Sequence, residues 1–91
     1  MERVSEDNLL KLYGYVVSSE YRKVIIKLLL EKPLTPKLMA QRSNKPQSHI
    51  SRAVKELENK GIVKCVNPDV KKGRIYRLTD IGVKIAKMFF R

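Results

Sequence analysis

Side chains that can donate hydrogen bonds recur at helical spacing between Pro46 and Lys60. At roughly 100° per residue, Ile50, Val54 and Leu57 fall on one face of a helix over this stretch. The opposite face is polar, and two more polar residues lie beside it near the start: Ser48, Arg52, Lys55 and Asn59, then Gln47 and Ser51. Such side chains donate hydrogen bonds to base edges and phosphates. The stretch therefore predicts a helix that packs on one side and can contact a nucleic acid on the other.

The acidic residues of this stretch are kept away from its polar face. Glu56 and Glu58 lie in the second half and toward the sides, whereas the N-terminal part of such a helix usually enters the major groove of DNA. This segregation of charge fits a DNA ligand. The alternative is an ordinary solvated helix face, because charged surface is the default for a soluble helix.

A second cluster of cations surrounds Gly73 and favours the first interpretation. Lys71, Lys72 and Arg74 crowd this position, where no core requires positive charge. A hairpin tip that touches backbone phosphate or the minor groove would need such residues. The alternative is an exposed turn in which Lys discourages the aggregation of edge strands. A secondary candidate is Lys37, because it lies near the start of a helix whose N-terminus can hold a phosphate.

The residue types needed for catalysis or metal binding are scarce. Cys65 is the only cysteine and His49 the only histidine, which leaves no internal disulfide and no ordinary zinc cluster. No combination of Ser, His and acid, no glycine-rich phosphate loop and no paired-carboxylate motif is recognisable. We therefore expect no enzyme activity, no metal and no cofactor. His49 is expected near DNA or in water, and Tyr76 in the core, because it alternates with Leu78 along a strand.

Capping residues, prolines and glycines divide the chain into the elements that must position these groups. Thr35 before Pro36 is a strong helix start, because the hydroxyl accepts a free N–H and proline sits where its missing donor is harmless. Asn44 tolerates the left-handed conformation that ends a helix, and Gly61 does the same further on. These signals predict three helices, over about residues 20–31, Pro36 to Arg42 and Pro46 to Lys60.

After the third helix the hydrophobic period changes from helical to extended. Two strands, Ile62 to Val66 and Arg74 to Thr79, are predicted to form a basic hairpin over residues 62–79. A last helix over residues 80–91 follows, with one apolar face: Ile81, Ile85, Met88 and Phe89. The sequence pattern does not decide whether the apolar part of residues 1–17 is helix, strand or both.

The composition allows one domain with one modest core. The chain has 91 residues, 43% of them hydrophobic, and its 20 Lys and Arg against 9 Asp and Glu give a formal net charge of +11. This balance favours a polyanionic partner, although a high Lys content also solvates the surface of thermophile proteins. Nucleic acid is the first candidate and acidic membrane the second. No apolar run approaches the roughly 20 residues that span a bilayer, and no signal peptide precedes the fold, so a cytoplasmic location is expected.

The order of these elements predicts a mainly α fold with a small β-hairpin: a winged helix-turn-helix with a three-helix core, a two-stranded wing and a C-terminal helix. Three segments carry a further resemblance, TPKLMA, SHISRAVKELENKGIVKC and KKGRIYRLTDIG, with SSEYRKVIIKLL before them. In these segments the chain resembles the short archaeal winged-helix regulators of the MarR/ArsR-like group. The chain departs from that group at Lys45 and Ser43, where its members often have an apolar residue and a tighter turn. This difference can displace the start of the third helix by about one residue.

The resemblance implies a transcription regulator that binds double-stranded DNA sequence-specifically, with helix 46–60 in the major groove and hairpin 62–79 as the wing. It implies that the groove is faced by Gln47, Ser48, Ser51, Arg52 and Lys55. Wing contacts would come from Lys71, Lys72 and Arg74. The metal-sensing Cys and His sets of some members of the group are absent from this sequence, which argues against regulation by metal. The sequence indicates no particular small-molecule effector.

A homodimer is implied by the resemblance and also by hydrophobicity. The ending Met88-Phe89-Phe90 and the apolar N-terminal segment are more hydrophobic than so small a monomer comfortably exposes. Residues 1–17 and 80–91 are therefore the candidate dimer elements of a single domain over residues 1–91. The alternative is that these two segments cover each other within one chain.

Three other functions compete with the regulator. A winged-helix module that binds a protein is the first, because a fold does not determine a function. A non-specific architectural nucleic-acid binder is the second. RNA binding is the third, and the charge permits it, but the chain shows neither the aromatic-studded strands of an RNA-recognition motif nor a GxxG clamp.

Overall fold

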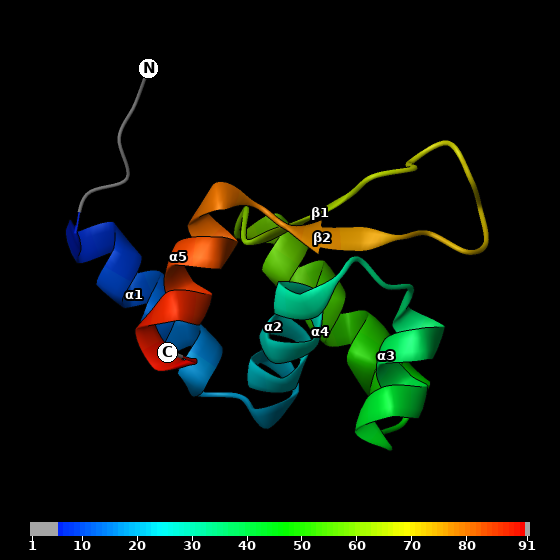
Figure 1. Ribbon diagram of the computed structural model, residues 1–91, viewed down its shortest axis with the longest axis horizontal. Coiled ribbons are helices and arrows are strands. Elements are labelled where there is room, and N and C mark those ends of the chain that lie inside the picture. The colour runs from blue at the N-terminus through cyan, green and yellow to red at the C-terminus, as the bar shows by residue number, and fades with distance from the viewer. Residues whose placement is uncertain (1–5, 91) are drawn as a thin grey trace.

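Five helices and a two-stranded hairpin make up residues 6–90, the part of the chain that the computed structural model describes. Their order is α1 (Glu6–Val17), α2 (Glu20–Glu31), α3 (Pro36–Ser43), α4 (Gln47–Asn59), β1 (Val63–Cys65), β2 (Tyr76–Leu78) and α5 (Asp80–Phe89). In Figure 1 the helices pack together, while the loop between β1 and β2 extends away from them. The predicted mainly α fold with a small hairpin is confirmed.

Helix α1 occupies the N-terminal segment that the sequence pattern left open. Val16 of α1 is fully buried, and Tyr13 packs on Phe89 of α5 with ring centroids 5.6 Å apart. The apolar residues of the segment are therefore explained by burial of one side of a helix. Residues 1–5 of the predicted N-terminal element, and Arg91 of the predicted last helix, lie outside the described residues.

Side-chain caps start three of the helices. Ser19, Thr35 and Thr79 each accept a hydrogen bond from the backbone N–H three residues further on, at 3.4, 3.2 and 3.1 Å. Asn44 has φ 56° and ψ 42°, the left-handed conformation predicted to end α3. As a result, α3 and α4 begin and end within one residue of their predicted bounds.

Both strands are shorter than predicted. The sequence predicts strands from Ile62 to Val66 and from Arg74 to Thr79, whereas β1 and β2 pair over three residues each. The pairing is antiparallel, with the register Val63↔Leu78, Lys64↔Arg77 and Cys65↔Tyr76. Alternating residues thus face the core and solvent, which buries Val63, Tyr76 and Leu78.

A side chain and a third backbone segment take over where the ladder stops. Oδ1 of Asn67 accepts a hydrogen bond from the N–H of Ile75 at 2.7 Å, and its Nδ2 donates to the carbonyl of Gly73 at 3.1 Å. Backbone bonds from Val66 to Ile75 at 2.8 Å and from Thr79 to Ile62 at 3.0 Å lie just beyond the two ends of the named strands, and the Asn67 bonds replace strand pairing only from there toward the loop. Beside β2, Leu34 and Tyr76 exchange two backbone hydrogen bonds of 3.1 and 2.9 Å. Because Leu34 directly precedes the cap of α3, this bridge attaches the hairpin to the start of that helix.

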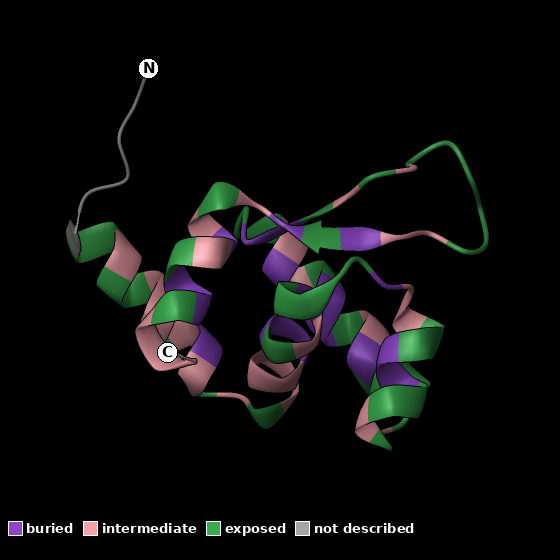
Figure 2. Cartoon of the chain, viewed as in Figure 1, coloured by how far each residue is buried: buried purple, intermediate pink, exposed green. Residues whose placement is uncertain are grey.

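All five helices, Leu34 and the hairpin contribute buried side chains to the core. Figure 2 shows buried residues on the inward sides of these elements and exposed residues along the hairpin loop. The buried residues of α4 are the predicted Ile50, Val54 and Leu57, together with Ala53. Tyr76 is 3% exposed, so its predicted place in the core is confirmed. The core therefore holds α4 with its polar face outward.

Candidate nucleic-acid interface

A groove of about 750 Å³ lies between the hairpin loop, α4 and the start of α3. It is lined by seven of the nine side chains that the sequence assigns to DNA contact: Lys37, Gln47, Ser51, Lys55, Lys71, Lys72 and Arg74. Its lining is completed by residues that the sequence did not assign: Thr35, Pro36, Val54, Gly73 and Tyr76. Three elements that are separate in the sequence thus present amide, hydroxyl and cationic groups around one hollow.

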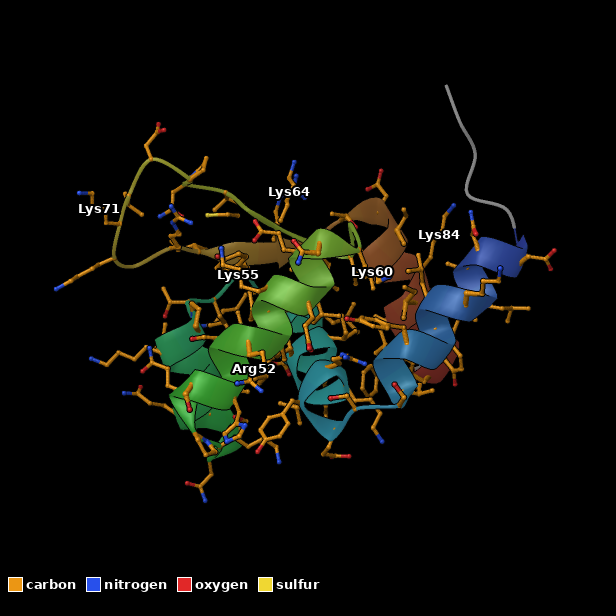
Figure 3. The ribbon with its side chains drawn as sticks, turned by 180° about the vertical axis from the view of Figure 1, so that it is seen from behind. Arg52, Lys55, Lys60, Lys64, Lys71 and Lys84 are labelled. Carbon is orange, nitrogen blue, oxygen red and sulfur yellow. The ribbon has the colours of Figure 1, made fainter. Side chains whose placement is uncertain are left out.

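The other two predicted residues, Ser48 and Arg52, lie outside this groove and are exposed on α4. A rotation of roughly 100° per residue explains the division. Gln47, Ser51 and Lys55 turn toward the hairpin, whereas Ser48 and Arg52 form the outward crest of the helix. Figure 3 shows Arg52 and Lys55 along the outer side of α4. The helix therefore offers a projecting line of donors beside a basic groove.

The groove keeps most of its positive charge free of ion pairs. Lys55 lies 3.9 Å from Glu58, and both side chains are partly exposed, so this pair is weak and can part when a phosphate competes. Within residues 6–90, Lys37, Lys71 and Lys72 form no ion pair. Free ammonium groups around a hollow favour an anionic ligand.

The second acidic residue of α4 faces away from the groove. Glu56 pairs with Arg22 of α2 at 3.2 Å, and the Arg22 side chain is only 16% exposed. Arg22 also lies 3.7 Å from the ring centroid of Tyr15 and donates to the carbonyl of that residue at 2.8 Å. This contact joins α1, α2 and α4 and pairs the Glu56 charge with a cation outside the groove.

Arg74 is held within the hairpin loop. Its Nε donates to the carbonyl of Val70 at 2.9 Å, and one terminal nitrogen donates to the carbonyl of Pro68 at 3.4 Å. A guanidinium has five N–H donors, so further donors stay available for a ligand. The geometry therefore gives Arg74 a positioning role in the loop that the sequence prediction did not include.

The hydroxyl of Tyr76 stays protonated beside the groove. Burial raises the pKa of Tyr76, the charge of Glu58 raises it further, and a hydrogen bond with Arg74 opposes both effects. A protonated hydroxyl can donate as well as accept a hydrogen bond. Tyr76 lines the groove but is only 3% exposed, so little of its ring is open to a ligand there.

His49 is exposed, which agrees with one of its two expected environments, and it also makes a ring contact that the sequence did not predict. Its ring stacks on Tyr21 of α2, with centroids 5.2 Å apart and planes 13° apart, and Lys45 lies 5.1 Å from the centroid of the same tyrosine. His49 is exposed, but this stacking ties the first turn of α4 to α2. The start of α4 is therefore fixed by packing that the helical period of α4 alone does not show.

Two other features are absent from the part of the chain that the structure describes. Residues 6–90 contain no group of three or more His, Cys, Asp or Glu side chains placed to hold a metal ion. None of the helices in that range has the length and apolar character needed to cross a membrane.

Comparison with known proteins gives one family and several structures. Residues 11–81 match the family model described as "Sugar-specific transcriptional regulator TrmB". No protein of curated function matches the chain in sequence. The resemblance to regulators is thus confirmed at the level of a regulator family.

The fold is shared with solved winged-helix regulators. HlyU from Vibrio cholerae is 20% identical, with a TM-score of 0.74, and the match covers all of both chains. The transcriptional repressor BigR from Xylella fastidiosa is 20% identical, with a TM-score of 0.73, over 93% of this chain and 90% of that one. ZitR from Lactococcus lactis is 21% identical, with a TM-score of 0.69, over 77% of this chain, which spans 49% of ZitR. The predicted winged helix-turn-helix architecture is confirmed by these similarities.

Proposed function

The chain belongs to the TrmB family of transcriptional regulators, and on that premise we propose that it regulates transcription by binding double-stranded DNA sequence-specifically. The observation that carries this proposal is the groove between α4 and the hairpin, which gathers seven side chains that the sequence assigns to DNA contact. Helix 46–60 enters the major groove, and hairpin 62–79 acts as the wing.

Each part of the site has its own role in this arrangement. The crest residues Ser48 and Arg52 reach base edges, because they are exposed on α4 and lie outside the groove. The groove side of α4 and the wing hold backbone phosphates on one border of the major groove, through Gln47, Ser51, Lys55, Lys71 and Lys72. Lys37, in the first turn of α3, adds a phosphate contact at a helix N-terminus.

The proposal includes a homodimer that contacts DNA with two copies of α4. Helices α1 and α5 pack on each other within one chain, as the contact between Tyr13 and Phe89 shows. They nevertheless leave Leu10 of α1 57% exposed. An apolar side chain there supports self-association through α1 and α5, and a two-fold dimer would read two half-sites. A small-molecule effector would bind between the subunits.

Two further expectations are retained as part of this proposal. The resemblance seen in the sequence implies an archaeal source. A DNA ligand also agrees with the expected cytoplasmic location.

Fluorescence anisotropy over a salt series tests the proposal, with the protein's own upstream region and a scrambled duplex as ligands. Arg52→Ala is expected to cost about 1–3 kcal/mol and to remove the preference for the upstream duplex, because it loses a base contact. Lys72→Ala is expected to weaken both complexes alike and to lower the salt slope by about 1. Lys32→Ala, an exposed position at the end of α2, is the control and should change neither property.

The outcomes separate the competing functions. A steep salt slope with no preference between duplexes would leave two possibilities. The protein is then an architectural DNA binder, or a specific regulator whose operator lies outside its own upstream region. If neither duplex binds at low salt, the proposal is rejected and a protein-interaction module takes its place.

A further inference from the structure

Two consecutive residues of α2 contact α4 at two separate places. Tyr21 stacks on His49 in the first turn of α4, with ring centroids 5.2 Å apart and planes 13° apart. Arg22 contacts Glu56 further along α4, where its Nε donates to Oε1 at 3.2 Å and a terminal nitrogen lies 3.2 Å from the same oxygen. We refer to the four residues of these contacts as the α2–α4 clamp: Tyr21, Arg22, His49 and Glu56.

Both contacts of the clamp lie on one side of α4, away from the groove. His49 and Glu56 are seven residues apart, so at roughly 100° per residue they lie within about 20° of each other around the helix. Both lie about 40–60° from Arg52, in the direction opposite to Lys55, which lines the groove. The crest, formed by Ser48 and Arg52, therefore lies between the clamp and the groove.

The Arg22 side chain is fixed by further partners in α1 and the turn after it. The terminal nitrogen that does not contact Glu56 donates to the carbonyl of Tyr15 at 2.8 Å and to Oγ of Ser18 at 3.2 Å. The guanidinium carbon also lies 3.7 Å from the ring centroid of Tyr15, and the side chain is only 16% exposed. A planar fork of donors with partners on several sides has little freedom to move. Glu56 is therefore attached to a junction of α1 and α2 that is itself well fixed.

Base contacts and phosphate contacts respond differently to a shift of α4. A hydrogen bond to a base edge needs a donor–acceptor distance of about 2.7–3.2 Å and a nearly straight angle. A binding site of this kind must be held to within roughly 0.5 Å. A lysine ammonium on a flexible stem can follow a phosphate through a larger displacement. A loosely held α4 would therefore lose discrimination between base sequences before it loses its attraction to DNA.

We propose that the α2–α4 clamp sets the direction of the crest, so that Tyr21 and Arg22 are positioning residues for sequence discrimination. This inference rests on the proposed function. Ring stacking and a charge-assisted hydrogen bond suit the role, because both depend strongly on geometry. The competing interpretation is that this side of α4 contributes only charge, or a direct phosphate contact from the Tyr21 hydroxyl.

Glu56→Ala separates positioning from charge. It breaks the contact with Arg22 and removes one negative charge, so a role limited to charge predicts tighter binding to every duplex. A positioning role predicts a weaker preference between duplexes instead. Glu58→Ala is the matched control, because it makes the same charge change on the same helix. The ion pair that it removes, with Lys55, lies within α4 and holds no second helix.

The wild-type protein first selects a preferred duplex from a random-sequence pool. Affinities for this duplex and for a scrambled one are then measured over a salt series, and thermal unfolding checks that each variant folds. Glu56→Ala is expected to lower the ratio of the two affinities by about fivefold or more, the lower end of what one base contact contributes. The salt slope should stay at the wild-type value, since no phosphate contact is lost. Glu58→Ala should keep the wild-type ratio.

Two substitutions of Tyr21 test the other end of the clamp. Tyr21→Leu removes the stacking on His49 and should lower the ratio as well, whereas Tyr21→Phe keeps the ring and should retain the wild-type ratio. Weaker binding of both duplexes by Tyr21→Phe would mean that the hydroxyl binds phosphate, which overturns a positioning role for this residue. A wild-type ratio in folded Glu56→Ala overturns the inference, and Tyr21→Leu decides the first-turn contact in the same way. Failure of the wild type to select any sequence overturns the proposed function instead.

Discussion

Arg74 differs from the other cations of the groove because much of its bonding is internal. The bonds from its guanidinium to Val70 and Pro68 close the hairpin loop that carries Lys71 and Lys72. An ammonium in its place keeps the charge but cannot reproduce the planar fork of donors. At the scale of single residues, Arg74 therefore holds the loop in place, whereas Lys71 and Lys72 supply unpaired charge.

We expect Arg74→Lys to loosen the wing although the net charge is unchanged. The two lost hydrogen bonds, at about 1 kcal/mol each, should raise exchange of the Val70 amide, which donates to the carbonyl of Asn67 at 3.2 Å, by up to roughly thirtyfold, and DNA affinity should fall with it. Lys72→Arg is the matched control, because it also keeps the charge and changes neither bond. Hydrogen exchange with and without DNA checks this. Unchanged exchange in Arg74→Lys would mean that Arg74 acts only as a phosphate ligand.

Much of the candidate site could be predicted from residue types because it depends on the helical period. Alternation between Ile50 and Arg52 on opposite faces of α4 follows from a repeat of roughly 3.6 residues. The division between crest and groove does not follow, since it depends on where the hairpin lies. The same limit explains why Asn67 and Tyr76 were missed as supports of the wing. The turn-forming pair Asn67-Pro68 was a signal for the first of them.

At the scale of elements, α5 and the start of the hairpin meet at Gly82. A Cβ at this position would collide with the backbone carbonyl of Ile62 and approach the Leu78 side chain to 3.2 Å. Thr79 reinforces the same junction, because its hydroxyl caps α5 and donates to the carbonyl of Gly61 at 2.6 Å. The close approach sets the distance between α5 and the strands.

Gly82→Ala is therefore expected to destabilise the fold, by about 1–3 kcal/mol, because a backbone carbonyl cannot move as a side chain can. Gly14→Ala in α1 is the control, because nothing lies within 4 Å of its added Cβ. It should raise stability by about 0.5–1 kcal/mol through helix propensity. Urea unfolding measures both changes in the free energy of unfolding, a decrease for Gly82→Ala and an increase for Gly14→Ala. A stabilising Gly82→Ala would contradict the packing described at this junction.

The hairpin shows where side-chain bonds take the place of strand pairing that the sequence pattern extends. Residues such as Ile62 and Val66 alternate with polar ones and so predict a longer strand. The side chain of Asn67 replaces the ladder near the loop, and Leu34 adds pairing from a distant segment. Strand bounds were therefore less predictable than helix bounds, which depend on local caps such as Thr35 and Asn44.

At the scale of the whole molecule, the question is whether the apolar surface of α1 is covered within one chain or by a second copy. Tyr13 and Phe89 satisfy part of this surface within one chain, which supports the alternative that the two terminal elements cover each other. Leu10 remains more than half exposed beside them. Self-association is therefore best tested at that residue.

Leu10→Glu is expected to shift a dimer toward monomer without loss of folding, because the side chain is 57% exposed in the single chain and a charge would be desolvated in an interface. Leu30→Glu, at an exposed position of α2, is the control. Sedimentation velocity over a concentration series measures the association constant, and circular dichroism measures folding. If both variants retain the wild-type mass, α1 is not the dimer element.

The sequence by itself determined the order of the elements from α2 onward, the helix bounds from Thr35 to Gly61 and the polar face of α4. These features depend on local caps, on backbone conformations that few residues adopt, and on a repeat within one helix. Only the tertiary structure decided that the hairpin, α3 and α4 share one groove and that Arg74 is bonded inside the loop. Those arrangements join residues far apart in the chain, and packing of the shared core sets their distances.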